Sequence, residues 1–357
     1  MTTSAGNTIR CYVGLGFLLL VGLPWMMVSC EPSYESGVVS FTGQTMGTRY
    51  KVSLAAKAPS SQWPPDTNHV RRLVNQKLDE INRQMSTYDP ESEISRFNQS
   101  ESNEWFPVSD ETAFVVAFAL EIGARTEGAF DPTIGPVVNV WGFGPGQQKE
   151  VVPNEQAILK ALARIGYQKL EVRKDPPALR KSNPGIYLDL SAIAKGYAVD
   201  QVTELLKAQG FGGTLVEIGG EVRTTGSKPD LSPWRIAIEK SEHSPQPFQQ
   251  VLELSDAALA TSGDYYNFFV KDGIRYSHSI DPQTGRPVHH ALAVVSVQAD
   301  TCMEADALAT ALLVMGTDRG YDWCIQHAVA GLFQYRHRLA IDTRSTPRFR
   351  QLYGIAE

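Results

Sequence analysis

The sequence has no excess of positive charge. Its 357 residues include 33 lysines and arginines against 39 aspartates and glutamates, so the formal net charge is −6. Proteins that bind nucleic acid carry a basic footprint that complements the phosphate backbone. The charge therefore argues against nucleic acid as a partner, while the proportions of apolar and charged residues are ordinary for a globular protein.

Cysteine is scarce as well. Two of the four cysteines, Cys11 and Cys30, fall in the N-terminal segment, and Cys302 and Cys324 lie far apart without the spacing of a metal site. An exported compartment would allow Cys302 and Cys324 to form a disulfide, but two buried free thiols are the interpretation that we favour.

Charged residues are missing from one long stretch, residues 11–29. Arg10 precedes this stretch and Cys30 follows it, which is typical of a secretory signal of the lipoprotein type. We predict a signal peptide at residues 1–29, lipidation of Cys30, a tether at residues 30–38, and a membrane-anchored protein that faces the periplasm. The alternative is an uncleaved membrane-spanning anchor, against which Pro24 and the glycines of the stretch argue.

Helical and alternating patterns follow one another along the rest of the chain. Helical spacing predicts helices over residues 67–85, 109–128 and 153–166, the last ending at Gly166, and over 300–316 with a capping box from Thr301 to Glu304. A strand that runs into a helix capped by Ser191 is expected over residues 185–210. Further strands cluster late in the chain, so the predicted class is α+β with a substantial mixed sheet in one domain at residues 39–357.

Asp306 and Thr310 stand four residues apart on the last of these helices, so both side chains lie on one face. Two oxygen ligands would suit a hard cation such as Mg²⁺. The spacing alone favours the ordinary alternative, in which the carboxylate is stabilised by the helix dipole and the threonine bonds back to its own helix.

Two glycines and a tyrosine occupy positions with more than one interpretation. Gly219 and Gly220 end an apolar strand shortly before Arg223, which would let backbone amides and a guanidinium approach a phosphate, or would form a β-bulge. Tyr88 falls in a turn after a helix, where an aromatic ring is either a core plug or a platform for a planar ligand. The glycine- and proline-rich residues 128–146 are expected to form a rigid loop that either lines a site or covers a core.

The stretch "RYSHSIDPQTGRPV" combines a strand with a turn. Asp281 to Gly285 have the residue types of a turn, and Gly285 supplies a positive φ. His278 stands just before this turn. A histidine at this place is either a solvated residue or a group that reaches into a site.

Eight blocks occur along the chain in a fixed order. They are "TMGTRY", "MSTYDPESEISRFN", "GAFDPTIGPVVNVWGFG", "LDLSAIAKGYAVD", "VEIGGEVRTTG", "TSGDYYNFF", "YSHSIDPQTGRPV" and "CMEADALATALLVMG". Together they closely resemble the ApbE family of FAD:protein FMN transferases, which are often exported lipoproteins. The resemblance covers nearly the whole chain beyond the N-terminal segment.

The resemblance implies an enzyme that cleaves FAD at its pyrophosphate, attaches FMN through a phosphoester to a Thr or Ser hydroxyl of a partner flavoprotein, and releases AMP with the help of Mg²⁺. The acceptor would be an exported or membrane-bound protein. The implied fold is an α+β architecture related to the T-fold, with FAD in a cleft between two subdomains. Hydrolysis of FAD to FMN and AMP, and FAD binding without catalysis, are the alternatives.

The resemblance also implies roles for individual residues. His278 would be the general base, and Asp264 a second residue that orients or assists. Mg²⁺ would be held by the carbonyl of Ala192 with Asp306 and Thr310. Lys195 falls at a flavin-contacting position where the family often has Glu. The residues implied to contact FAD are Met46, Tyr88, Ala129, Phe130, Asp131, Asp189, Lys195, Gly219, Gly220 and Ser279.

Overall fold

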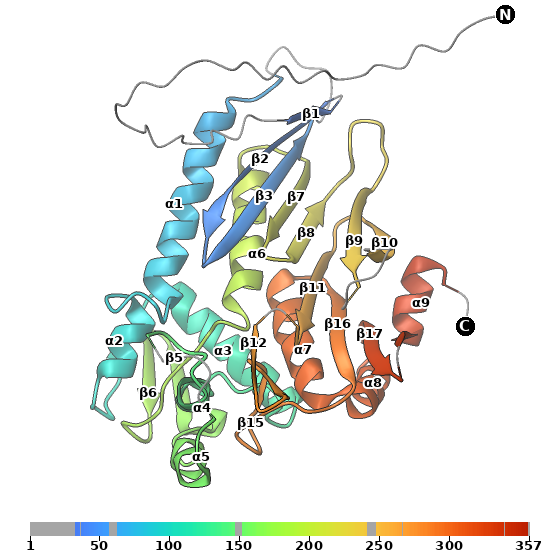
Figure 1. Cartoon of the computed structure of the whole chain (residues 1–357). Helices are drawn as coiled ribbons and strands as arrows, with labels where there is room; N and C mark the ends of the chain where they lie inside the picture. The colour runs from blue at the N-terminus through green and yellow to red at the C-terminus, as the bar shows by residue number, and fades with distance from the viewer. Residues whose placement is uncertain are drawn as a thin grey trace, which may run out of the picture. The chain divides into compact units, whose positions relative to one another are not determined.

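The computed structural model describes residues 33–35, 37–56, 63–146, 152–240, 248–265, 267–338 and 340–355. The predicted signal peptide and Cys30 lie outside these residues. A large antiparallel sheet dominates the unit Pro32–Glu357 (Figure 1). In spatial order its strands are β1 (Ser33–Glu35), β2 (Val38–Thr45), β3 (Thr48–Ala55), β7 (Gly213–Ile218), β8 (Glu221–Thr225), β11 (Ala258–Gly263), β16 (Leu292–Ala299), β17 (Ala330–His337) and β18 (Ala340–Ser345).

Four smaller sheets accompany the large one. They are formed by β4 (Phe106–Pro107), β6 (Pro177–Lys181) and β5 (Leu170–Lys174), by β9 (Trp234–Glu239) with β10 (Phe248–Leu254), by β12 (Phe268–Lys271) with β13 (Ile274–Ser277), and by β14 (Ile280–Asp281) with β15 (Arg286–Pro287). The helices are α1 (Thr67–Met85), α2 (Glu93–Gln99), α3 (Asp110–Arg125), α4 (Gly135–Val140), α5 (Glu155–Leu162), α6 (Ala194–Ala208), α7 (Cys302–Met315), α8 (Thr317–Gln326) and α9 (Pro347–Tyr353).

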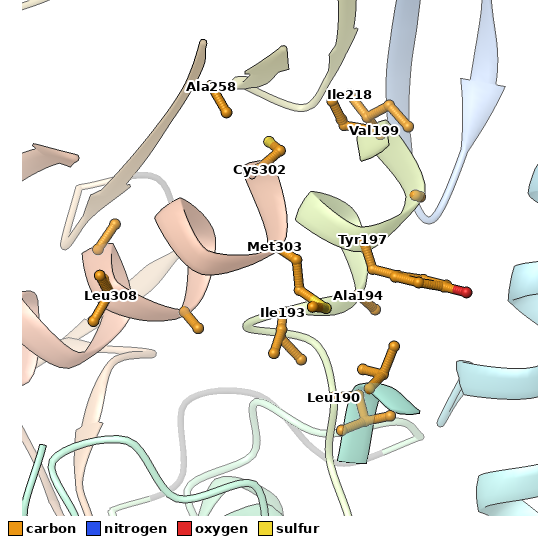
Figure 2. Packing of buried hydrophobic residues seen from close by; sticks show 14 of the residues in the cluster. Leu190, Ile193, Ala194, Tyr197, Val199, Ile218, Ala258, Cys302, Met303 and Leu308 are labelled. Atoms are coloured by element: carbon orange, nitrogen blue, oxygen red, sulfur yellow. The ribbon is translucent and has the colours of Figure 1, made fainter. Parts of the chain in front are cut away.

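Helices α6 and α7 form the layer against the large sheet. Helix α6 packs on β7 and β8, α7 packs on β11 and β16, and the two helices contact each other. Figure 2 shows Met303 of α7 beside Ile193 and Ala194, where α6 begins. These side chains are at most 8% exposed, so burial of apolar area fixes the position of α6 relative to α7. The start of α6 is thereby brought against the first turns of α7.

The α+β class is confirmed by this architecture. Within the described strands every named pairing is antiparallel, so the sheets are simpler than the mixed sheets expected. Residues 33–35 form the edge strand β1, although the sequence placed them in the tether. Among the described residues, none of the helices has the length and apolar character that crossing a bilayer requires.

Helix α7 follows its sequence signals closely. The hydroxyl of Thr301 accepts a hydrogen bond from the N–H of Glu304 at 3.3 Å, and Gly316 ends the helix with a φ of 81°. The capping box is only half formed, because the Glu304 carboxylate bonds to Arg125 at 3.0 Å. Cys302 and Cys324 are both buried and unpaired, which agrees with the interpretation as free thiols.

Four local predictions are wrong. Residues 185–190 form no strand beyond a single bridge between Tyr187 and Ile134. Ser191 does not cap α6, because its hydroxyl donates to Asp189 at 2.6 Å. Helix α5 ends at Leu162, four residues before Gly166, and the loop expected at residues 128–146 contains the short helix α4.

Candidate active site

A lysine and two carboxylates, which we call the charged centre, meet where α6, α7 and β8 converge. The ammonium of Lys195 lies 2.5 Å from Oε1 of Glu221 and 3.9 Å from Oδ1 of Asp306. Asp306 is 2% exposed, and its Oδ2 accepts the backbone N–H of Gly196 at 3.0 Å. Glu221 is 3% exposed, and its Oε2 has no hydrogen-bond partner among the described residues.

Burial and mutual charge set the protonation of the charged centre. Burial raises the pKa of Glu221 to about 7, opposed by the attraction of Lys195 and supported by the repulsion of Asp306. Burial likewise raises the pKa of Asp306, although Lys195 acts in the opposite direction. Burial on its own would lower the pKa of Lys195, but the two carboxylates outweigh it and raise that pKa. Lys195 is therefore charged and neutralises part of the acidic charge.

The oxygen groups around Asp306 suit a hard divalent cation. The ammonium of Lys195 lies 3.9 Å from Oδ1 of Asp306, which is beyond a hydrogen bond. The hydroxyl of Thr310 lies one turn further along α7, 3.3 Å from Ser262 Oγ, and Ala192 lies two residues before α6. Among the described residues, histidine, cysteine and carboxylate side chains form no group of three that could hold a metal. Substrate phosphates and water would complete the coordination, as Mg²⁺ commonly requires.

Two tight hairpin turns lie side by side at one end of the large sheet. Met46 and Gly47 join β2 to β3 with φ values of 49° and 71°, and Gly219 and Gly220 join β7 to β8 with 65° and 105°. A Cβ on Gly219 would lie 2.9 Å from Cγ2 of Thr48, so the two turns are in contact. The glycine pair therefore forms a two-residue hairpin turn with positive φ at both positions, and the alternative of a β-bulge is wrong.

Tyr88 and Asp189 form a polar wall beside the start of α6. The Tyr88 ring is 70% exposed, so it is not a core plug and is free to stack on a planar ligand. Asp189 accepts the N–H and the hydroxyl of Ser191 at 2.9 and 2.6 Å. Partial burial raises the pKa of Tyr88, and the nearby charge of Asp189 adds to this rise.

His278 is half-buried directly after β13. Its Nδ1 lies 3.0 Å from the carbonyl oxygen of Asn267, which also accepts the His278 backbone N–H at 3.0 Å. A carbonyl can only accept, so Nδ1 carries the proton and Nε2 keeps its lone pair. Burial lowers the pKa of His278, and the charges of Lys195 and Asp264 reach the ring with opposite effects. His278 is therefore neutral at pH 7 and lies within electrostatic range of the charged centre.

The hairpin that carries His278 rests on an aromatic cluster. Trp141 donates its indole N–H to the carbonyl of Gly285 at 2.8 Å, and Phe269 stacks on Tyr276 with ring centroids 5.1 Å apart. Gly285 has a φ of 65°, as the turn required. The single strand expected here is split into β13 and β14, and Ser279 lies in the break.

Asp264 is tied down by two arginines. Its carboxylate forms two hydrogen bonds of 2.8 Å with Arg336, and its backbone carbonyl accepts a hydrogen bond from Arg275 at 2.8 Å. A bidentate ion pair holds a carboxylate in one orientation. This geometry favours an orienting role near His278 over proton transfer by Asp264.

Residues 129–131 are packed inside the protein. Ala129 and Phe130 are each 3% exposed and belong to the main core. The Asp131 carboxylate accepts three hydrogen bonds, from the N–H and hydroxyl of Thr133 and from the N–H of Tyr167. These contacts are structural within the chain itself, and the contact of residues 129–131 with FAD stays a prediction.

Asp131 borders a hollow of about 340 Å³ that has a different location from the charged centre. Its lining residues are Glu127, Gly128, Asp131, Leu162, Ile165, Gly166, Tyr167, Gln168, Pro282 and Gln283. None of the residues that hold Lys195 or Asp306 is among them.

Sequence reasoning missed two carboxylates. Glu221 follows the glycine pair on a strand, where a charged residue on the buried face was the available signal. Asp200 lies on α6 and bonds to the start of α7 at 2.9 Å. Arg223, considered as a phosphate ligand, instead pairs with Asp200 at 3.0 Å and with Glu204 at 3.2 Å.

Comparisons with known proteins agree on one family. The model of the ApbE family matches residues 46–333. The FAD:protein FMN transferase of Vibrio cholerae is 44% identical over 295 residues, which cover 83% of this chain and 86% of the relative. That of Haemophilus influenzae is 37% identical over 344 residues, covering 95% and 98%.

Solved structures show the same relationship. The apo form of the flavinyl transferase ApbE of Pseudomonas stutzeri is 40% identical in sequence, with a TM-score of 0.82 over 90% of this chain and 98% of that chain. The resemblance found in the eight sequence blocks is thereby confirmed. The chain belongs to the ApbE family.

Proposed function

We propose that this chain is an FAD:protein FMN transferase, as the names of its relatives indicate, and that its reaction depends on Mg²⁺. The observation that carries the proposal is an oxygen-donor centre at Asp306 together with a neutral histidine, His278, which lies within electrostatic range of Lys195 and keeps a lone pair on Nε2. FAD supplies the group that is transferred, and the acceptor is a Thr or Ser hydroxyl of a partner flavoprotein.

His278 would take the proton of the acceptor hydroxyl on Nε2 while Nδ1–H stays bonded to Asn267. The hydroxyl oxygen then forms a bond to the FMN-side phosphorus, and the bond from that phosphorus to the bridging oxygen breaks. AMP leaves with that oxygen, and FMN remains on the acceptor as a phosphoester. A base with a lowered pKa is unprotonated at neutral pH, which is the state that this step needs.

Asp306, Thr310 and the carbonyl of Ala192 would hold Mg²⁺, which when bound neutralises phosphate charge at the bond that breaks. Lys195 supplies a second positive charge beside this position, and Glu221 keeps its ammonium in place at 2.5 Å. Tyr88 would stack on a planar ring of FAD, because its face is exposed. The paired turns at Met46 and Gly219–Gly220 would lie beside the dinucleotide, where the glycines allow the backbone a close approach.

The envelope is the proposed location. The pattern of residues 1–30 supports export and lipidation at Cys30, which would anchor the enzyme on the periplasmic side of a membrane. An exported or membrane-bound flavoprotein is the matching acceptor.

The test is a reaction of the purified protein with FAD, MgCl₂ and a candidate acceptor domain. In-gel flavin fluorescence and intact mass measure FMN on the acceptor, and chromatography measures AMP. We expect one AMP for each FMN attached. AMP without an adduct on any acceptor would assign the protein to FAD hydrolysis, and the absence of both products would leave FAD binding without catalysis.

A further inference from the structure

Asp200 joins the two helices that form the charged centre. Its Oδ1 accepts the N–H of Cys302 at 2.9 Å and the guanidinium of Arg223 at 3.0 Å, and its Oδ2 accepts the N–H of Met303 at 2.9 Å. Asp200 is 7% exposed, and its two bonds to the amides of α7 are shielded from water. The carboxylate of α6 thus takes the first two amides of α7, which a helix cannot satisfy internally.

A bond in the other direction, from an amide of α6 to a carboxylate of α7, is present as well. Asp306 of α7 accepts the N–H of Gly196, in the first turn of α6, at 3.0 Å. Within the described residues, α6 has no side-chain cap of its own, because Ile193 at its N-cap position makes no such bond. Each helix is therefore capped by a carboxylate from the other, and the positive end of each dipole faces a negative charge. Figure 2 shows the contact between the start of α6 and α7 at which these caps form.

This reciprocal cap fixes where Asp306 stands. Asp306 lies four residues after Cys302, one helical turn along α7. A helix moves as a rigid element, so a displacement of its first residues carries Asp306 with it. Thr301 caps only the N–H of Glu304 and leaves the first two amides to Asp200.

We propose that Asp200 is a positioning residue for the cation site, acting through α7 on Asp306 and Thr310. This inference rests on the proposed function, because it takes Asp306 and Thr310 as metal ligands. Arg223 holds the Asp200 carboxylate in turn, so β8 takes part in the same arrangement.

The test compares Mn²⁺ binding to the wild-type protein and to Asp200→Asn by isothermal titration calorimetry without FAD. We expect Asp200→Asn to weaken Mn²⁺ binding roughly 10- to 100-fold, the usual effect of losing a group that orients a metal ligand. Glu93→Gln is the matched control. Glu93 also binds the start of a helix, since it accepts the Ser109 N–H at 3.0 Å before α3, and its bonds go to Ser109 and Thr112, which lie outside α6 and α7.

A general loss of stability would lower the Mn²⁺ affinity of both variants alike, whereas a positioning role lowers the Mn²⁺ affinity of Asp200→Asn only. Equal Mn²⁺ affinity of Asp200→Asn and the wild type would overturn the proposal, as would equal weakening in Glu93→Gln. If Asp200→Asn fails to fold, Arg223→Gln is the substitute, because it keeps both bonds from the α7 amides to Asp200. Arg223→Gln should weaken Mn²⁺ binding less than Asp200→Asn, but measurably. Wild-type Mn²⁺ affinity in Arg223→Gln would overturn the proposal. A wild-type protein that binds no Mn²⁺ would instead refute the metal role of Asp306, and this proposal with it, even where FMN transfer is observed.

Discussion

Gly196→Ala should damage both stability and cation binding, because no side chain fits between α6 and α7 at this point. A Cβ at residue 196 would lie 2.3 Å from the Cys302 carbonyl oxygen, 2.7 Å from its carbon and 2.8 Å from Cβ of Asp306. Ordinary contact begins near 3.4 Å, so the helices would have to separate by about 1 Å. The nearest atoms are backbone and cannot rotate away.

Opposing effects decide the magnitude. Alanine is favoured over glycine within a helix by about 1 kcal/mol. Overpacking costs about 1–3 kcal/mol, and weakening the bond from the Gly196 N–H to the Asp306 carboxylate adds about 1.5 kcal/mol or more. Because the contact is with backbone, we expect the upper part of this range and a net loss of about 3 kcal/mol in the free energy of unfolding.

Urea unfolding followed by tryptophan fluorescence measures this loss, and calorimetry measures Mn²⁺ affinity. Gly320→Ala in α8 is the matched control, because its Cβ would lie 3.2 Å from the Leu312 carbonyl oxygen and 3.3 Å from the Phe333 ring. It should stay within about 1 kcal/mol of the wild type. A Gly196→Ala protein with wild-type stability and wild-type Mn²⁺ affinity would refute the reasoning.

Three further predictions concern single side chains. His278→Ala should lower FMN transfer about 10²- to 10⁴-fold with FAD still bound. Because burial lowers the His278 pKa, transfer by the wild-type protein should persist down to pH 6.5 and decline only below it. A decline centred above pH 6.5 in the pH profile would contradict this. Lys195→Met should lower the free energy of unfolding by roughly 3–5 kcal/mol at pH 8, where Glu221 and Asp306 remain buried without a cation. The loss should be smaller at pH 5, which lies below the raised pKa of Glu221 of about 7. Equal losses in urea unfolding at both pH values would disprove the account. Tyr88→Ala should weaken FAD binding by about 1–3 kcal/mol in a fluorescence titration, with unchanged stability of the protein. Tyr88→Phe, which keeps an aromatic ring, should bind FAD normally. Unchanged FAD affinity of Tyr88→Ala would disprove the stacking role.

Periodic patterns predicted the regular elements well. Helix α1 buries Val70, Val74, Leu78 and Ile81 as the helical spacing required, and the double glycine between β7 and β8 marked a real hairpin. The residues before α6 were mistaken for a strand because the apolar residues Leu188 and Leu190 stand at alternate positions in the sequence. Both side chains are buried in the structure, but without a strand. Asp189 instead folds back on Ser191, and such local side-chain bonds compete with strand pairing.

The candidate site was harder to predict because its parts come from distant segments. The spacing of Asp306 and Thr310 placed both on one helix face, but it gave no sign of the Gly196 amide that Asp306 accepts. Lys195 and Glu221 form a close pair although 26 residues separate them, and no local pattern reports such a contact. The burial of Ala129 and Phe130 in the core was likewise invisible to the resemblance that made them flavin contacts.

The reciprocal cap between α6 and α7 also has a consequence for the timing of folding. Asp200 and Cys302 are 102 residues apart, and Gly196 and Asp306 are 110 residues apart. At about 5–20 residues per second, synthesis needs roughly 5–20 s to deliver α7 after α6 has been made. Throughout this interval the nascent chain carries Asp200 and the N-terminal end of α6 without the partners that α7 later supplies. The charged centre can therefore be completed only after α7 has been made, and a chain that stops short of residue 306 cannot assemble it.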